Sequence, residues 1–197
     1  MHKDDIDSKL EARLRAGDRE AMDGVIRLYL PRVLRAARAS GLRTEQAEDI
    51  VQAVFVTFIE KIKGFEGRSQ VRTWLFGILF RKMLEAGRQA KRDRQFDDVA
   101  EVDQSQFHSD GTWATPPQLP DLAVYSREIR EHIADCLGGV SDKQRMAFVL
   151  REVESMDTTE ICEVLEVTPT NFGVLIHRAR NLLRHCLETK GIGKESC

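Results

Sequence analysis

The sequence predicts an all-α fold made of two small helical domains joined by a flexible acidic linker. Apolar residues recur at steps of three and four through most of the 197 residues, and no stretch shows the clean alternation of a half-buried strand. This periodicity stops between residues 96 and 121, where six acidic residues and three prolines occur without any Lys or Arg. We therefore expect domains at 1–95 and 122–190, a linker at 96–121 and a short tail at 191–197.

The first domain is expected to contain two amphipathic helices before its first glycine-bearing loop. A helix over 21–39 carries an apolar stripe and contains Pro31, which predicts a kink or a break. A helix over 45–63 carries a second apolar stripe, which we expect to lie in the core. That stripe consists of Ile50, Val51, Val54, Phe55, Phe58, Ile59 and Ile62.

A loop with two glycines, Gly64 and Gly67, leads into a basic helix that begins near Val71. One side of this helix is apolar and should face the core, whereas the far side carries arginines and is flanked by aromatic rings. This combination suits single-stranded DNA, because bases stack on rings and phosphates pair with guanidinium groups. For Trp74, packing in the core is the favoured interpretation, and it is compatible with a supporting role at such a site.

The second domain should resume its helices near residue 122 and end in a helix-turn-helix. Its last helix has an apolar side and an opposite side that is polar and cationic, which is typical of a helix that reads duplex DNA. On periodicity alone, an ordinary amphipathic surface helix is the alternative. The helix-start patterns are a Ser141–Gln144 capping box, an Asp157–Glu160 pair, and Thr168 followed by Pro169.

The net charge of −2 hides a strong segregation of charge along the chain. Residues 61–94 hold ten Lys and Arg against three Asp and Glu, and residues 173–190 hold four against one. Residues 131–172 are the reverse, with three basic and nine acidic residues. Because both basic blocks coincide with expected amphipathic helices, we interpret them as nucleic-acid contacts.

Cys136, Cys162, Cys186 and Cys197 lack the paired spacing of a metal site, and we expect thiols rather than disulfides in a cytoplasmic chain. Zinc is a remote alternative, since His132 with Cys136 would supply only two ligands. The longest apolar run is far too short to span a membrane, and the charged N-terminus lacks a signal-peptide core. We expect a cytoplasmic protein without membrane insertion, catalytic residues, cofactor or metal.

Three motifs, in this order and spacing, resemble bacterial RNA polymerase sigma factors of the extracytoplasmic-function (ECF) group. They are EDIVQAVF from Glu48, FEGRSQVRTWLFGI from Phe65 and IHRARNLLR from Ile176. The resemblance covers about residues 20–95 and 122–188 and implies the conserved sigma regions 2 and 4. In this family region 2 captures the opened −10 element, including a flipped base, and region 4 reads the −35 element as duplex DNA.

The resemblance implies three sets of site residues. Asp49, Gln52 and Phe55 would dock on the clamp helices of the β′ subunit of core RNA polymerase, while region 4 would also meet the β flap. The −10 set is Phe65, Glu66, Gly67, Arg68, Ser69, Thr73, Trp74, Gly77, Arg81 and Arg88. The −35 set is Thr168, Thr170, Asn171, Gly173, His177, Arg178, Arg180 and Arg184.

The resemblance also implies an anti-sigma factor as a partner. Gly77, Arg81, Glu85, Gly173 and Leu175 differ from residues that family members often have, which affects the promoter sequence rather than the fold. An autonomous helix-turn-helix regulator is the alternative, although it leaves the basic loop and helix of the first domain without a role. A helical redox or metal sensor would rest only on scattered Cys and His residues.

Overall fold

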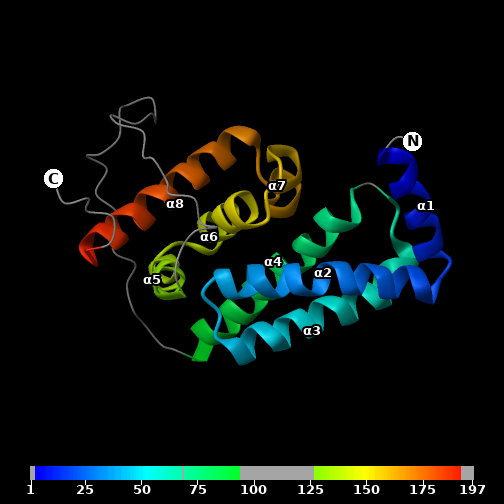
Figure 1. Ribbon diagram of the computed structural model, residues 1–197, viewed down its shortest axis with the longest axis horizontal. Coiled ribbons are helices and arrows are strands. Elements are labelled where there is room, and N and C mark those ends of the chain that lie inside the picture. Colours follow the sequence, from blue (N-terminus) through cyan, green and yellow to red (C-terminus); the bar gives the residue numbers. More distant parts are fainter. Residues whose placement is uncertain (1–2, 68, 94–126, 192–197) are drawn as a thin grey trace.

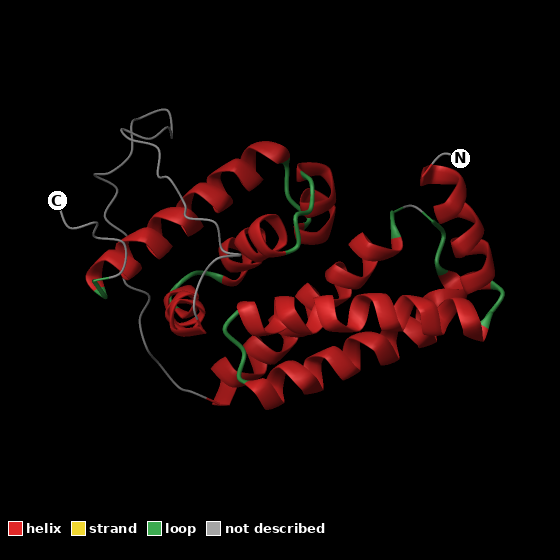
Figure 2. Cartoon of the chain, in the orientation of Figure 1, coloured by secondary structure: helices red, strands yellow, loops and turns green. Residues whose placement is uncertain are grey.

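The computed structural model describes residues 3–67, 69–93 and 127–191 (Figure 1). Every regular element within these ranges is helical, which confirms the all-α prediction (Figure 2). The predicted linker lies outside these ranges. The N-terminal part contains α1 (Lys3–Arg15), α2 (Arg19–Ala39), α3 (Thr44–Lys61), the 3₁₀ turn η1 (Ile62–Gly64) and α4 (Val71–Asp93). The C-terminal part contains α5 (Arg127–Gly138), α6 (Asp142–Phe148), the π-helical turn η4 (Val149–Val153), α7 (Thr158–Leu165) and α8 (Pro169–Thr189).

Helices α2, α3 and α4 enclose the core of the N-terminal part, with α2 and α3 lying side by side (Figure 1). Helix α2 begins where the Asp18 carboxylate accepts hydrogen bonds from two backbone N–H groups of the first turn, at 3.0 and 3.2 Å. Phe58 of α3 and Phe76 of α4 are fully buried, and each contributes about 2–3 kcal/mol through its buried apolar area. Helix α1, which the sequence analysis did not anticipate, adds the fully buried Leu14 to this core.

Two expectations for the N-terminal helices can be compared with the structure. Of the kink or break expected at Pro31, the break does not occur, because α2 continues through this residue and tolerates the loss of one backbone hydrogen bond. Ile59, expected in the core, is 47% exposed. It follows Val56 by three residues on the side of α3 that faces away from α2 and α4, so it belongs to the outer stripe of the helix.

The helix starts of the C-terminal part agree with the sequence. The hydroxyl of Ser141 caps α6 in a complete capping box, and Asp157 caps α7 in a second one. The hydroxyl of Thr168 accepts a hydrogen bond at 3.2 Å from the backbone N–H of Asn171, the third residue of α8. Helix α6 is shorter than expected, because the chain changes to the π-helical turn η4 after Phe148.

A disulfide joins Cys136 of α5 to Cys186 of α8, with the two Cα atoms 5.7 Å apart. This corrects the expectation that all the cysteines are thiols. That expectation rested on compartment and local spacing, whereas the packing of α5 along α8 brings together two residues 50 positions apart. Cys162 is a free thiol, and burial raises its pKa although Arg151 opposes the rise. Because Cys136 is bonded to sulfur, it cannot act with His132 as a zinc ligand.

Reduction of this disulfide should lower the free energy of unfolding of the C-terminal part by about 2–4 kcal/mol, because the bond closes a long loop in the unfolded chain. Urea unfolding followed by circular dichroism, with and without reductant, measures the difference. Cys136→Ser should reproduce the loss without reductant. Cys162→Ser is the control and should give a smaller change. Equal midpoints for the oxidised and reduced proteins would contradict a stabilising role.

Among the described residues, the N-terminal and C-terminal parts pack against each other mainly through α4 with α7 and α2 with η4. Helix α4 therefore lies between the N-terminal core and α7, and its residues 75–80 are all buried. Four ion pairs cross the contact between residues far apart in the sequence. They join Arg72 to Glu160, Arg81 to Glu166, and both Arg32 and Arg35 to Glu154.

Candidate nucleic-acid interface

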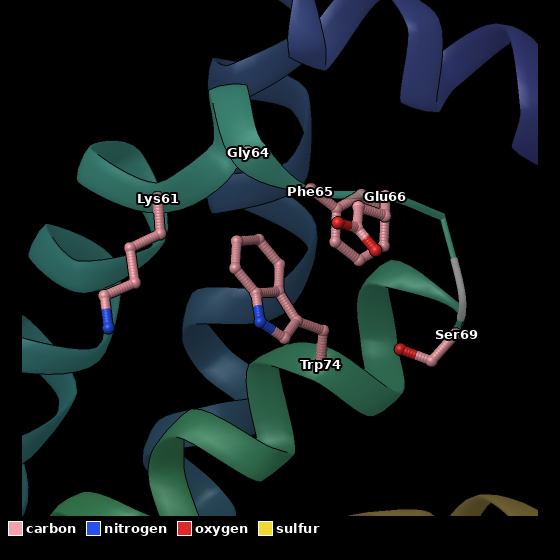
Figure 3. A pocket seen from close by; sticks show the side chains of 6 residues that line it. All are labelled: Lys61, Gly64, Phe65, Glu66, Ser69 and Trp74. Atoms are coloured by element: carbon pink, nitrogen blue, oxygen red, sulfur yellow. The ribbon is translucent and has the colours of Figure 1, made fainter.

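A pocket of about 320 Å³ opens where the loop after η1 meets the start of α4 (Figure 3). Its lining combines the rings of Trp74 and Phe65 with the polar side chains of Lys61, Glu66 and Ser69. The indole of Trp74 lies between Lys61 on one side and Phe65 with Glu66 on the other. A planar base needs such a site, because it stacks through its face and forms hydrogen bonds at its edge.

Phe65 packs against Trp74 in the wall of the pocket, and its own ring is too buried to stack with a base. Its side chain is only 7% exposed, and its ring stacks on Trp74 with centroids 4.8 Å apart and an angle of 26° between the planes. Trp74 also contacts the buried ring of Phe58, with centroids 5.6 Å apart. The sequence analysis expected Phe65 to contact the −10 strand, whereas its burial favours a position that supports Trp74. Trp74 is half-buried, so its ring packs against Phe58 and Phe65 and is still partly exposed to solvent.

Gly67 sets the shape of the loop beside this pocket. Its φ of +70° lies in the left-handed region, which glycine adopts without strain. A Cβ atom built at this position would come within 2.5 Å of the Glu11 carboxylate of α1. A larger residue would displace the flexible Glu11 carboxylate, and the positive φ would strain its backbone as well. The neighbouring Arg68, predicted to contact the −10 strand, lies outside the described residues.

The remaining predicted −10 residues differ in exposure. Arg88 is exposed, and Arg81 is 63% exposed at its side chain, although its guanidinium donates to Glu166 at 2.8 Å. Thr73 is only 4% exposed and Gly77 is buried. The expectation that both are exposed on the open side of α4 was wrong, since both are buried.

Helix α8 presents exposed residues on one side, grouped in its N-terminal half with one more near its C-terminal end. Asn171, Val174, Arg178 and His185 follow one another at steps of three, four and seven residues, and all are exposed. Val174 and His185 were absent from the predicted −35 set, because the sequence placed the polar face further around the helix. An exposed valine can pack against a thymine methyl group in the major groove. The predicted contacts Thr168, Thr170 and Gly173 are also exposed, at the N-terminal end of the same helix.

Three predicted −35 residues are partly engaged within the chain. The guanidinium of Arg180 donates to the Glu152 carboxylate at 2.5 Å, and Arg184 lies 3.8 Å from a carboxylate one turn later. Burial lowers the pKa of His177, and the positive charge of Arg180 lowers it further. Both effects favour the uncharged form of the imidazole. Arg178, by contrast, is exposed.

The outer side of α3 forms a further surface. Asp49 and Gln52 are exposed there, and Val56 and Ile59 continue the same stripe at 48% and 47% exposure. Phe55 is only 6% exposed and belongs to the core, so it is removed from the predicted polymerase set. The sequence did contain the signal for Val56 and Ile59, because residues 49, 52, 56 and 59 follow helical spacing.

An all-α chain with a helix-turn-helix in one half and an aromatic pocket beside a basic helix in the other belongs to the class of two-domain DNA-binding transcription proteins. Comparison with known families narrows this class. Residues 25–93 match the family model for sigma-70 region 2, and residues 130–183 match the model for sigma-70 region 4.

Curated relatives and solved structures agree with these matches. A probable RNA polymerase sigma factor of Haemophilus influenzae is 30% identical over 156 residues, covering 75% of this chain and 80% of the relative. The ECF RNA polymerase sigma factor SigW of Bacillus subtilis is 27% identical, covering 87% of this chain and 91% of the relative. The structure of CnrH in complex with the cytosolic domain of CnrY has a TM-score of 0.67 at 23% identity, covering 93% of this chain and 97% of CnrH.

The chain therefore belongs to the sigma-70 family of RNA polymerase sigma factors, within the ECF group. As a sigma factor, it binds core RNA polymerase and directs promoter-specific initiation of transcription.

Proposed function

We propose that the two halves of the chain divide promoter recognition between an unpaired strand and a duplex. The observation that carries this proposal is the difference in chemistry between the two surfaces. One is a pocket with an aromatic ring in its lining, and the other is a convex helix with an exposed polar stripe. A flipped base fits the first kind of surface, and the edges of paired bases in a major groove fit the second.

In region 2, a −10 base would enter the pocket and stack on Trp74. Lys61, Glu66 and Ser69 stand at its rim, where they can reach the base edge or the adjoining phosphate. The following nucleotides would run along α4 toward Arg81 and Arg88. Phosphates of an unpaired strand pair readily with such exposed guanidinium groups.

In region 4, α8 would enter the major groove at the −35 element. Asn171 and Val174 lie in its first two turns, where side chains reach base edges in a helix-turn-helix. Arg178 follows one turn later and would contact phosphate. His177, Arg180 and Arg184 would contribute secondary contacts beside this stripe.

We also assign the outer side of α3 to core polymerase. Asp49 and Gln52 supply polar groups next to the exposed apolar pair Val56 and Ile59, and an interface core of this kind is typical of protein partners. Region 4 would meet the β flap in addition to DNA. A solved structure of the sigma factor RpoE from Bartonella quintana in complex with the anti-sigma factor NepR matches this chain with a TM-score of 0.63. We propose that this chain has an anti-sigma partner as well.

The domain limits proposed from the sequence are 1–95 for region 2 and 122–190 for region 4, with the acidic linker at 96–121 between them. Within residues 3–67, 69–93 and 127–191, no helix has the length and hydropathy of a transmembrane span. We propose that the protein works in the cytoplasm with polymerase and acts by binding, without catalysis or a cofactor.

Run-off transcription with purified core polymerase, on the promoter of the protein's own operon, tests this function. We expect specific transcripts only when both proteins are present. The double substitution Asp49→Ala with Gln52→Arg should weaken binding to core enzyme at least about tenfold, which corresponds to 1.4 kcal/mol, and should leave helical content unchanged.

The matched control is Asp23→Ala with Gly24→Arg, which makes the same change of charge at exposed positions of α2. It should retain both polymerase binding and transcription. Tight operator binding by the chain alone, combined with no effect on run-off products, would support an autonomous regulator instead.

A further inference from the structure

Helix α1 lies against the loop that forms one wall of the aromatic pocket (Figure 1). Phe65, Glu66 and Ser69 of this pocket loop line the site, so the conformation of the loop sets the shape of the pocket. Gly67 lies between them in the sequence, and α1 is the element beside it. The position of α1 therefore affects the pocket, although the lining residues in Figure 3 all belong to other elements.

Two neighbouring stripes of α1 have different surroundings. Leu10 and Leu14 are one helical turn apart, with Leu14 fully buried in the core and Leu10 packed against that core. Burial of a leucine contributes about 1.5–3 kcal/mol, so this stripe anchors α1 to the rest of region 2. Glu11 and Arg15 form the adjacent stripe, and both lie at the pocket loop. The anchored leucines thus hold a pair of charged side chains against the loop.

Glu11 contacts the pocket loop at Gly67. A Cβ atom placed on Gly67 would lie 2.5 Å from a carboxylate oxygen of Glu11, 3.5 Å from its carboxyl carbon and 3.8 Å from the Arg15 guanidinium. The Glu11 side chain is only 14% exposed. Its distance to the half-exposed Arg15 is 3.9 Å, and such an ion pair contributes little by itself. Glu11 therefore acts mainly by packing, because it fills the space beside the one loop residue that has no side chain.

We propose that α1 braces the pocket loop and that Glu11 is the positioning residue through which this helix acts. The brace rests on the proposed function, because it deepens the assignment of the pocket to a flipped −10 base. Glu11 touches no base in this arrangement and restricts the loop backbone at Gly67 before the strand arrives. A site that is already held in its binding conformation loses less entropy on binding, so the brace raises the affinity for the strand.

The fluorescence of Trp74 in the full chain tests the brace without DNA. Trp113, the only other tryptophan in the sequence, is replaced by Phe in every protein compared. In this background Glu11→Ala should raise the acrylamide quenching constant of Trp74 at least about twofold, because a loosened loop opens locally and exposes the half-buried indole.

Strand binding is measured with reconstituted holoenzyme. The affinity for a labelled single strand of about 12 randomised nucleotides, relative to core polymerase alone, should fall about tenfold for Glu11→Ala. That loss corresponds to a loop that adopts its binding conformation in only about one molecule in ten.

Two variants separate packing from charge. Glu11→Gln keeps the size of the side chain and removes its charge, so it should restore wild-type values in both measurements. Glu163→Ala is the matched control, because it makes the same substitution at an exposed position of α7. It should leave both the quenching constant and the strand affinity unchanged.

A wild-type quenching constant for Glu11→Ala would overturn the brace, as would equal effects of Glu11→Ala and Glu163→Ala. A Glu11→Gln variant as accessible to acrylamide as Glu11→Ala would overturn the packing role of the side chain. If wild-type holoenzyme bound the strand no better than core polymerase while acrylamide still separated the variants, the assignment of the pocket to −10 DNA would fail and the brace would stand.

Discussion

Replacing Trp74 with Ala should prevent strand capture and open-complex formation while leaving closed-complex formation nearly intact. The substitution removes the ring on which a −10 base would stack, and stacking contributes about 1–3 kcal/mol per base. It also removes the partner of Phe65 and Phe58, so the free energy of unfolding of region 2 should fall by about 3 kcal/mol. Permanganate footprinting of reconstituted holoenzyme would show no reactive thymines at −10, whereas filter binding to closed promoter DNA would change little.

Two further variants separate loss of stacking from loss of stability. Trp74→Phe keeps an aromatic ring and should recover most of the melting. Lys61→Ala with Ser69→Ala removes polar groups from the pocket rim without touching the core, and it should impair melting at wild-type stability. A template opened artificially at −10 should rescue Trp74→Ala only in part, because strand capture is lost as well. Full rescue on that template would remove the pocket from strand binding.

Replacing Asn171 and Arg178 with Ala should weaken engagement of closed promoters by about one to two orders of magnitude. A good base contact contributes about 1–3 kcal/mol, and a phosphate contact adds affinity for every sequence alike. Both residues are exposed on α8, so the substitutions should leave the fold unchanged. The effect should shrink on a template already opened at −10, where region 2 contributes a larger share of the binding. Filter binding of holoenzyme on closed and pre-opened templates measures both values.

Lys143→Ala is the control for the recognition helix, because it removes an exposed positive charge of region 4 on α6 rather than on α8. It should leave promoter selectivity unchanged. The two single substitutions should have different effects. Asn171→Ala should relax the sequence preference at one base pair, whereas Arg178→Ala should weaken binding to all sequences. If the α8 variant and the pocket variant failed at the same step of initiation, the division between duplex and single-strand surfaces would be wrong.

Local sequence patterns predicted most of the helices and the starts of α6, α7 and α8 in region 4. Capping depends on a side chain and a backbone group three residues apart, so the pairs at Ser141 and Asp157 were readable without any tertiary information. Apolar spacing likewise placed the cores of α3, α4 and α8. For Pro31, local rules predict an interruption of the helix, whereas the packing of α2 keeps that helix continuous.

The parts of the site that could not be predicted depend on contacts across the chain. Thr73 and Gly77 have the spacing of an exposed face, but both are buried in the folded chain. Phe65 and Phe55 were assigned by resemblance to contact surfaces, although their side chains are almost fully buried in this chain. Periodicity shows that a residue lies on a given side of a helix, but it does not show which element will cover that side.

The segregation of charge along the sequence also predicts a contact between the two domains, which the sequence analysis did not consider. The basic block at 61–94 was interpreted as a nucleic-acid contact, and the acidic block at 131–172 was left without a role. In the structure Arg72 of the first block is paired with Glu160 of the second. Complementary charge in two domains of one chain therefore has two explanations, an external nucleic acid or the other domain.

The disulfide between α5 and α8 has a mechanical consequence. Helix α5 begins at Arg127, the first described residue after the segment that separates the two regions, and Cys136 lies in its last turn. Cys186 lies near the C-terminal end of α8, more than three turns from the exposed Asn171. A force that pulls on α5 from the preceding chain would therefore pass through this covalent bond to the C-terminal end of α8.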